Sequence, residues 1–152
     1  MIRYTTGNIM DSSAEALVNT VNTVRVMGKG IALQFKQAFP HNFNVYKQAC
    51  DSGQLTTGKI LAVIDRELLL GERLIINFPT KSHWKSPSAY EYIESGLIAL
   101  VAYLRENPVK SMAMPALGCG NGGLDWHKVR PMIEQHLSAL DLAIWVYEPG
   151  NH

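Results

Sequence analysis

The sequence has only two cysteines, Cys50 and Cys119, which lie far apart in a chain of 152 residues. Neither belongs to a Cys/His spacing typical of a zinc site, and two isolated cysteines do not make a disulfide framework. The N-terminus lacks the apolar segment of a secretory signal, and no apolar run approaches the ~18 residues of a membrane span. We therefore expect a cytoplasmic protein with no metal, no cofactor and no membrane partner.

A large excess of either charge is also absent, because 14 basic and 13 acidic residues give a formal net charge of +1. Near-neutrality argues against a protein that holds nucleic acid by bulk charge, so any such partner must be held by a local patch. No repeat, linker or low-complexity segment interrupts the chain. Its length and its 47% of apolar residues favour one domain over residues 1–152, with a sizeable core. We expect a monomer.

Short apolar segments typical of strands alternate with segments of helical apolar period. The predicted strands span residues 2–4, 16–18, 60–64, 74–77, 112–114 and 142–147. The predicted helices span residues 31–38, 41–50 and 89–105, and a last helix leads up to Leu140. Ser88 and Glu91 have the spacing of a capping box, and Pro131 is expected to open the last regular helix after a separate turn. The alternation predicts an α/β fold with a mostly parallel sheet between helical layers.

In sheets of this kind, ligands bind beyond the carboxyl ends of the strands. The strand at residues 16–18 is followed by Asn19 and Asn22, and then by the glycine-containing segment 28–31 at the start of a helix. Carboxamides bind hydroxyl groups, and backbone N–H groups at a helix N-terminus suit a phosphate. This pattern favours a sugar-phosphate site. Alternatively, the asparagines cap a turn and the glycines only bend it.

A second glycine-rich loop, residues 115–123, follows the strand at residues 112–114. Its glycines match the dinucleotide-binding spacing, but that motif belongs in the first βαβ unit of a domain. Cys119 lacks the glycines that flank a nucleophile elbow two residues away on either side, so we do not expect a catalytic thiol. Two such loops, each between a strand and helical sequence, instead favour the two sides of one diphosphate site.

The strand at residues 74–77 runs into Thr80 and Lys81, with His83, Trp84 and Lys85 just behind. A lysine at such a strand end is either a solvated surface residue or a functional one. This segment alone does not distinguish the two, so the other motifs are needed.

Two further strand ends carry side chains that suit a nucleotide base. Asn8 follows the first strand and has a carboxamide that suits an adenine edge, and Tyr147 ends the last strand with an aromatic ring that suits stacking. Both residues are equally compatible with ordinary turn and core positions.

These motifs resemble those of the macrodomains, which bind or hydrolyse ADP-ribose in a three-layer α/β/α sandwich built on a six-stranded mixed sheet. Residues 17–22 are similar to the family's V-N-A-A-N strand end, residues 28–32 to its first glycine loop, and residues 115–120 to its second. The resemblance covers nearly the whole chain. Together with residues 77–81, these segments are most similar to the antitoxin macrodomains that remove ADP-ribose from thymidine in DNA.

The resemblance implies an ADP-ribose site. Asn8 and Ile9 are implied to contact adenine and Asn22 to hold the distal ribose, while the two glycine loops bind the diphosphate mostly through backbone N–H groups. Together with the residues chosen from the strand ends and loops, the full predicted ADP-ribose set is Asn8, Ile9, Asn19, Asn22, Gly28, Lys29, Gly30, Ile31, Thr80, Pro115, Leu117, Gly118, Cys119, Gly120, Asn121, Gly122 and Tyr147.

Lys81 corresponds to a catalytic lysine of one branch of the family, where the lysine acts with an aspartate on the second glycine loop. Here Gly122 occupies the place of that aspartate, so the two-residue mechanism cannot be carried over whole. Lys81 is expected to be catalytic either as a nucleophile or as a cation that stabilises or protonates the leaving group.

The expected activity is an ADP-ribosyl glycohydrolase that acts on ADP-ribosylated thymidine in single-stranded DNA and reverses the modification made by a partner toxin. The alternatives are a hydrolase of ADP-ribosyl esters on acidic side chains and a non-catalytic ADP-ribose reader. Lys81 favours the two enzymes over the reader. His83, Trp84 and Lys85 favour contact with DNA, because an aromatic ring stacks on bases and cations attract phosphates. Alternatively, Trp84 is a rim residue packed on the helix at residues 89–105.

Overall fold

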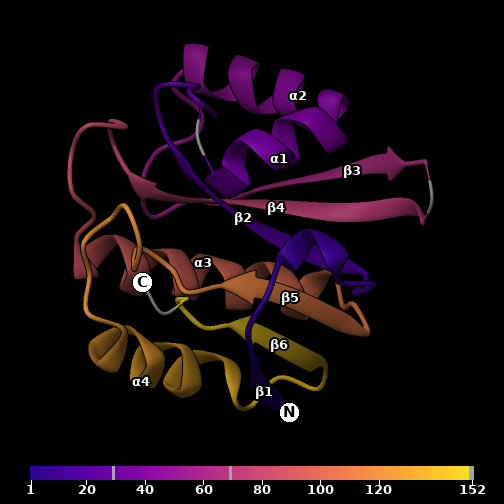
Figure 1. Ribbon diagram of the computed structural model, residues 1–152, viewed down its shortest axis with the longest axis vertical. Coiled ribbons are helices and arrows are strands. Elements are labelled where there is room, and N and C mark those ends of the chain that lie inside the picture. The colour runs from indigo at the N-terminus through magenta and orange to yellow at the C-terminus, as the bar shows by residue number, and fades with distance from the viewer. Residues whose placement is uncertain (29, 69, 151–152) are drawn as a thin grey trace.

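The computed structural model describes residues 1–28, 30–68 and 70–150. Across these residues, six strands form one sheet in the order β1-β6-β5-β2-β4-β3, with helices on both of its faces (Figure 1). The elements in chain order are β1 (Ile2–Thr5), the 3-10 helix η1 (Ile9–Asp11), β2 (Ala16–Asn22), α1 (Gly30–Ala38), α2 (Pro40–Asp51), β3 (Leu61–Glu67), β4 (Gly71–Lys81), α3 (Tyr90–Glu106), β5 (Ser111–Pro115), α4 (Trp126–Leu137) and β6 (Ala143–Tyr147).

The sheet is mostly parallel, as the alternation of strands and helices predicts. The pairs β1–β6, β6–β5, β5–β2 and β2–β4 are parallel, and the edge strand β3 pairs with β4 in the antiparallel direction. The predicted mixed, six-stranded α/β sheet is therefore confirmed. Two strands run further than their apolar segments, because β2 continues to Asn22 and β4 continues to Lys81. These extensions bring polar side chains to the carboxyl edge of the sheet.

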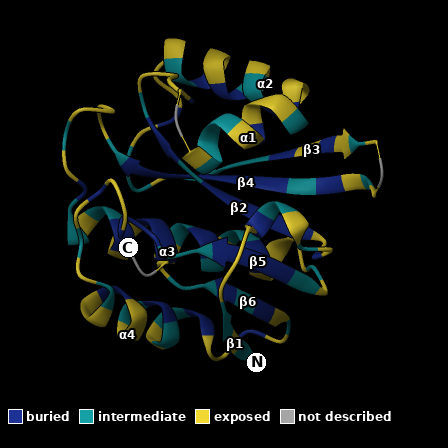
Figure 2. Cartoon of the chain, viewed as in Figure 1, coloured by how far each residue is buried: buried dark blue, intermediate teal, exposed yellow. Residues whose placement is uncertain are grey.

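The core lies on both faces of the sheet. Alternate residues of β2 serve the two faces: Ala16 and Val18 pack in the cluster that contains α3 and α4, and Leu17 packs in the cluster with η1 and α1. Buried residues follow the central strands, whereas the outer sides of the helices are exposed (Figure 2). A parallel sheet covered on both faces requires apolar residues on both sides of its strands, and β2 is buried along nearly its whole length.

The predicted capping box at the start of α3 is wrong. The N-cap residue is Ala89, and no side chain caps this helix end. The backbone N–H of Ser88 instead donates to the carbonyl oxygen of Gly122, at 3.0 Å. Ser88 is therefore used to hold the second glycine-rich loop, and a local pattern cannot reveal such a long-range partner.

The predicted break at Pro131 is also wrong, because α4 runs without interruption from Trp126 to Leu137 with Pro131 inside it. The helix begins early because Asp125 is its N-cap and accepts a hydrogen bond from the N–H of His127 at 2.9 Å. Val129 then lies buried in the same core cluster as Ile133. Burial on both sides of the proline holds the helix together despite the missing N–H.

Within the described residues, no helix is both long and apolar enough to cross a membrane. In the same residues, no group of three or more His, Cys, Asp and Glu side chains is arranged to hold a metal ion.

We expect Gly96→Ala to lower the free energy of unfolding by about 1–3 kcal/mol, as overpacking of a core usually does. A Cβ atom at Gly96 of α3 would lie 2.3 Å from Cζ of Phe78, which is fully buried in β4. At an exposed helix position, Gly→Ala would instead raise the free energy of unfolding by about 1 kcal/mol. A decrease would therefore show that the new Cβ atom meets Phe78. Denaturant unfolding measures it. Ser95→Ala, at the exposed neighbouring position, is the control and should change stability by less than about 0.5 kcal/mol.

Candidate functional site

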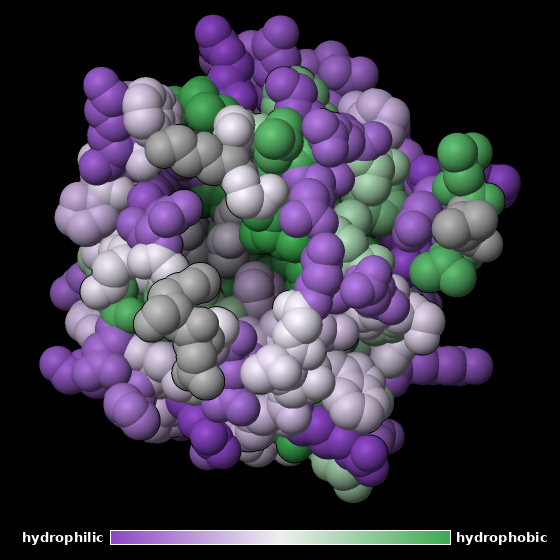
Figure 3. All heavy atoms as spheres, viewed as in Figure 1, coloured by the Kyte–Doolittle hydropathy of each residue, from purple (hydrophilic) through white to green (hydrophobic). Residues whose placement is uncertain are grey.

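The carboxyl ends of β2, β4 and β5 open into a cavity of about 840 Å³, a size typical of sites for small molecules and cofactors. Figure 3 shows the surface hollowed near the middle of this face. Parallel pairing places Asn22, the last residue of β2, opposite Lys81, the last residue of β4. The described lining residues are Thr20, Val21, Asn22, Val26, Gly28, Gly30, Ile31, Ala32, Thr80, Lys81, Trp84, Lys85, Pro115, Ala116, Gly118, Cys119, Gly120, Asn121 and Gly122.

The charged side chains among these lining residues are both lysines, Lys81 and Lys85. No carboxylate is among them. A concave site with cations and backbone N–H groups attracts anions and does not suit a cationic ligand. The electrostatics of the cavity therefore fit a phosphate-containing ligand.

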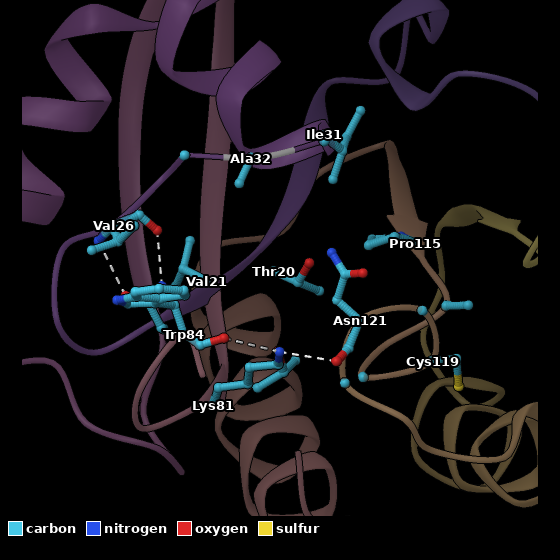
Figure 4. Close-up of a pocket in the computed structure, with 18 of the residues that line it drawn as sticks. Thr20, Val21, Val26, Ile31, Ala32, Lys81, Trp84, Pro115, Cys119 and Asn121 are labelled. Carbon is cyan, nitrogen blue, oxygen red and sulfur yellow. Dashed lines mark hydrogen bonds between the residues drawn. The ribbon is translucent and has the colours of Figure 1, made fainter. Parts of the chain in front are cut away.

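Lys81 joins two walls of the cavity. Its Nζ donates to the carbonyl oxygen of Asn121 at 3.0 Å and to that of Trp84 at 3.4 Å. Figure 4 shows the amine between these two carbonyl groups. An ammonium group has three donors and no acceptor, so two carbonyl partners satisfy it well and leave one N–H for a ligand.

Asn22 lines the cavity, but most of its hydrogen-bonding capacity is used by the protein. Its Oδ1 accepts from the N–H groups of Val24 and Val26, at 3.1 and 3.2 Å, and from the hydroxyl of Tyr46 at 3.0 Å. Its Nδ2 donates to the carbonyl oxygen of Val26 at 2.8 Å. Among the described residues, the second N–H of this amide makes no hydrogen bond, so it is the group of Asn22 that can reach a ligand hydroxyl.

The second glycine-rich loop is shaped by close backbone packing. A Cβ atom at Gly122 would lie 2.3 Å from the carbonyl oxygen of Gly118 and 2.5 Å from Oγ of Ser88. The loop in this form therefore accepts only glycine at that position, and an aspartate cannot stand there. Asp125 does not replace it, because its carboxylate caps α4. A lysine–aspartate pair is thus not assembled in this cavity.

Cys119 lies in the loop but is a poor nucleophile. It is buried, and its Sγ lies 3.5 Å from the carbonyl oxygen of Leu117. Burial, together with the nearby charge of Asp125, raises the pKa of the Cys119 thiol to about 11. The thiol is therefore protonated at neutral pH, which agrees with the sequence-based expectation.

The segment behind Lys81 forms the rim of the cavity. Trp84 is 42% exposed, the His83 ring stacks on it with a centroid separation of 5.6 Å, and Nζ of Lys85 lies 4.9 Å from the centre of its ring. Trp84 and Lys85 line the cavity, whereas His83 does not. Exposed aromatic surface beside a cation is the combination that binds single-stranded nucleic acid, although stacking of this kind stays a prediction here.

Some of the residues predicted to bind ADP-ribose lie outside the cavity lining. Asn8 caps η1 and donates to Oε1 of Gln34 at 2.9 Å, while Ile9 and Tyr147 pack in the same cluster as Ile31. Asn19 is fully buried near Asn77. Leu117 is also fully buried. Lys29 lies outside the described residues. The ADP-ribose contacts predicted for these six positions remain predictions, as do those of the predicted residues that line the cavity.

Several lining residues were not among the predicted contacts. They are Thr20, Val21, Val26, Ala32 and Ala116, each of which lies within or next to a predicted motif. Thr20, Val21, Ala32 and Ala116 lie inside the predicted motifs, and extending the segment 28–31 by two positions toward the N-terminus also finds Val26. Val26 is four residues beyond Asn22, and it lines the cavity because Asn22 folds the intervening chain back on itself.

These features define a class of protein: a three-layer α/β/α domain with an anion-binding cavity between two glycine-rich loops at the carboxyl edge of its sheet. The Macro domain family model matches residues 18–133. This chain belongs to the macrodomain family.

The chain is similar to several characterised macrodomain proteins. It is 53% identical over 150 residues to a protein of Thermus aquaticus named DNA ADP-ribosyl glycohydrolase, and the match covers 98% of this chain. The macrodomain of Mycobacterium tuberculosis DarG superposes with a TM-score of 0.92 at 47% identity, covering 99% of each chain. Thermosipho africanus DarTG in complex with ADP-ribose superposes with a TM-score of 0.90 at 37% identity, covering 97% of this chain and 41% of that one. This chain spans about two fifths of the length of the curated relatives, 41% of the Thermus protein and 43% of a Mycobacterium tuberculosis protein that is also named DNA ADP-ribosyl glycohydrolase.

We expect Cys119 of the folded protein to react slowly with iodoacetamide at pH 8 and faster as the pH approaches 11, because only the thiolate reacts. The unfolded thiol ionises near pH 9, so the contribution of Cys119 to stability is complete below pH 9 and declines as the pH rises from 9 to 11. Peptide mass spectrometry of labelled protein measures the reaction, and urea-unfolded protein is the control. Fast labelling of folded protein at pH 7 would contradict the buried, protonated thiol.

Proposed function

We propose that this chain is an ADP-ribosyl glycohydrolase that releases ADP-ribose from ADP-ribosylated thymidine in single-stranded DNA. The observation that carries the proposal is the amine of Lys81, which lines an anion-binding cavity beside the second glycine-rich loop. The name of the Thermus relative, which is 53% identical, supports the activity. The ADP-ribose bound to the Thermosipho relative supports the ligand.

Binding follows from the two glycine-rich loops. The diphosphate of ADP-ribose accepts hydrogen bonds from their backbone N–H groups, and the two lysines add attraction for its charge. The distal ribose then lies toward the ends of β2 and β4, where Asn22 and Lys81 stand opposite each other. The adenine lies toward η1 and Tyr147, beyond Ile31.

The reaction breaks the bond between the anomeric carbon of the distal ribose and the thymine nitrogen. Water supplies a hydroxyl group to the carbon and a proton to the base. No described lining residue is a carboxylate that would act as general base and activate water. Catalysis therefore acts on the anomeric carbon or on the leaving group. Lys81 can attack the carbon, form an imine with the opened sugar and be released by water, or it can remain an ammonium ion that stabilises or protonates the departing base.

Two observations favour this activity over the alternatives. A pure reader of ADP-ribose needs no amine next to the distal ribose, and Lys81 lines that part of the cavity. A lysine–aspartate mechanism is not available because Gly122 admits no side chain. We further propose that the protein works in the cytoplasm and opposes a partner ADP-ribosyltransferase. A Thermosipho relative, 39% identical, is named as a fusion of a DNA ADP-ribosyl transferase with a DNA ADP-ribosyl glycohydrolase, which supports that role.

Free ADP-ribose is expected to bind the wild-type protein and to raise its melting temperature, as a ligand specific to the folded state does. Gly120→Leu should abolish this binding and leave the unfolding transition nearly unchanged, because Gly120 lines the cavity and a Cβ atom there has no neighbour within 4 Å. Gly120→Ala should weaken binding less. Calorimetric titration measures all three proteins. No binding by wild type at millimolar ADP-ribose would refute the proposal, and unchanged affinity in Gly120→Leu would refute the loop's role.

Lys81→Ala is expected to abolish release of ADP-ribose from a modified oligonucleotide and to leave the affinity for free ADP-ribose within about fivefold, roughly 1 kcal/mol. Release is measured by chromatography of the products. Lys59→Ala, at an exposed lysine outside the cavity, is the matched control and should behave as wild type. Full activity in Lys81→Ala would show that another group performs the reaction.

Borohydride reduction during turnover separates the two roles of Lys81. A reduced adduct on the peptide that contains Lys81 supports the nucleophile. Absence of an adduct, with partial activity in Lys81→Arg, supports the cation, because Arg keeps the charge and cannot form the imine.

A further inference from the structure

The chain between β2 and α1 forms a compact turn, residues 22–28, that is organised by Asn22. The carboxamide of Asn22 forms hydrogen bonds with the backbone of Val24 and Val26. The hydroxyl of Tyr46 in α2 donates to Oδ1 and to the backbone carbonyl oxygen of Asn22. Met27 is buried in the cluster that contains Tyr46. This turn is therefore a fixed part of the structure, and its outward side chains have defined positions.

Two of those side chains are apolar and exposed. Val24 and Val26 are 37% and 39% exposed, and Arg25 between them has φ of 61°. Among the described residues, Arg25 alone combines a side chain with a positive φ. Such a backbone is unfavourable for an L-residue, and strain of this kind persists mainly at functional positions. Single exposed valines are ordinary, but Val26 lines the cavity, and Val24 is exposed two residues before it on the same strained turn.

The turn is joined to the segment that carries Trp84. Both the backbone N–H and Oγ1 of Thr23 bond the carbonyl oxygen of Ser82, at 3.3 and 2.8 Å. Val26 and Trp84 both line the cavity, and Figure 4 draws them on the same side of it as Lys81. The two segments are thus joined, and Val26 and Trp84 give this side of the cavity an apolar rim with Lys85 beside it. Arg25 is paired with Asp51 but keeps about half of its side chain exposed.

We propose that Val24 and Val26, together with Trp84, form the subsite that holds the base of the modified nucleotide, an inference that rests on the proposed function. The base leaves the ribose at Lys81, and the apolar rim begins beside that amine. A pyrimidine ring offers a flat face for Trp84 and, in thymine, a methyl group for apolar contact with the valines. Flanking phosphates meet Lys85 and Arg25. A strand of nucleic acid therefore fits this rim better than an acidic peptide, which offers no ring.

The test uses the intact protein with the double substitution Val24→Thr and Val26→Thr. Threonine keeps the shape and the branched Cβ but removes apolar surface, and both positions are exposed, so the fold should be retained. Ile64→Thr is the matched control, because Ile64 is an exposed, β-branched residue on the edge strand β3 and does not line the cavity. Trp84→Ala is the positive comparison.

The substrate is an oligonucleotide with one ADP-ribosylated thymidine, and the same strand without modification is the binding probe. The valine variant is expected to raise KM about tenfold, corresponding to loss of apolar contact at two side chains. Its kcat should stay within about twofold, and its Kd for free ADP-ribose should equal that of wild type. Binding of the unmodified strand, measured by fluorescence anisotropy at low salt, should weaken in parallel. Trp84→Ala should show the same pattern.

If the valine variant has the same KM as Ile64→Thr, the subsite is refuted, and the proposed function stays intact. An equal loss of affinity for free ADP-ribose would also refute it, because the turn would then belong to the ADP-ribose site itself. If the wild-type protein binds ADP-ribose but neither processes the modified strand nor binds the unmodified one, both the subsite and the proposed DNA substrate fail.

Discussion

Parallel pairing of β2 with β4 on one side and with β5 on the other is the constraint on which the site depends. Because parallel strands end at the same edge of a sheet, this pairing gathers Asn22, Lys81 and Pro115 around one cavity. The register between β2 and β4 shifts between Val21 and Asn22. In a regular strand these two neighbours would point to opposite faces. The bulge lets Asn22 meet Tyr46 of α2, in whose cluster Val21 also packs.

The sheet and the place of the site could be predicted from the sequence, because both follow from periodicity and from what stands at strand ends. The failures have one cause, which is that local patterns do not show distant partners. Ser88 has the spacing of a cap but is bonded to Gly122, and Pro131 lies inside a helix that Asp125 starts early. Asn19 and Asn22 look equivalent in the sequence, yet only Asn22 lines the cavity, because Asn19 lies deeper in the sheet and is fully buried near Asn77.

Backbone and side chains make different contributions to the cavity. Backbone N–H groups of two glycine-rich loops suit a diphosphate of any origin, whereas the lysine side chains add positive charge at one side of the cavity. Gly122 packs so closely on Gly118 that a carboxylate cannot stand opposite Lys81. The same packing leaves both charged lining residues positive. A site with this balance of charge favours a dianionic ligand, so the close packing of the loop also sets the charge of the cavity.

The bond from the N–H of Ser88 to the carbonyl oxygen of Gly122 also affects what ligand binding costs. It ties the second glycine-rich loop to the start of α3, and it is made by backbone atoms. The loop therefore loses its conformational entropy when the protein folds, and that loss does not recur when a ligand arrives. Substitutions of nearby side chains leave this bond in place. The fold itself thus orders this loop, which lowers the entropy cost of binding any ligand there.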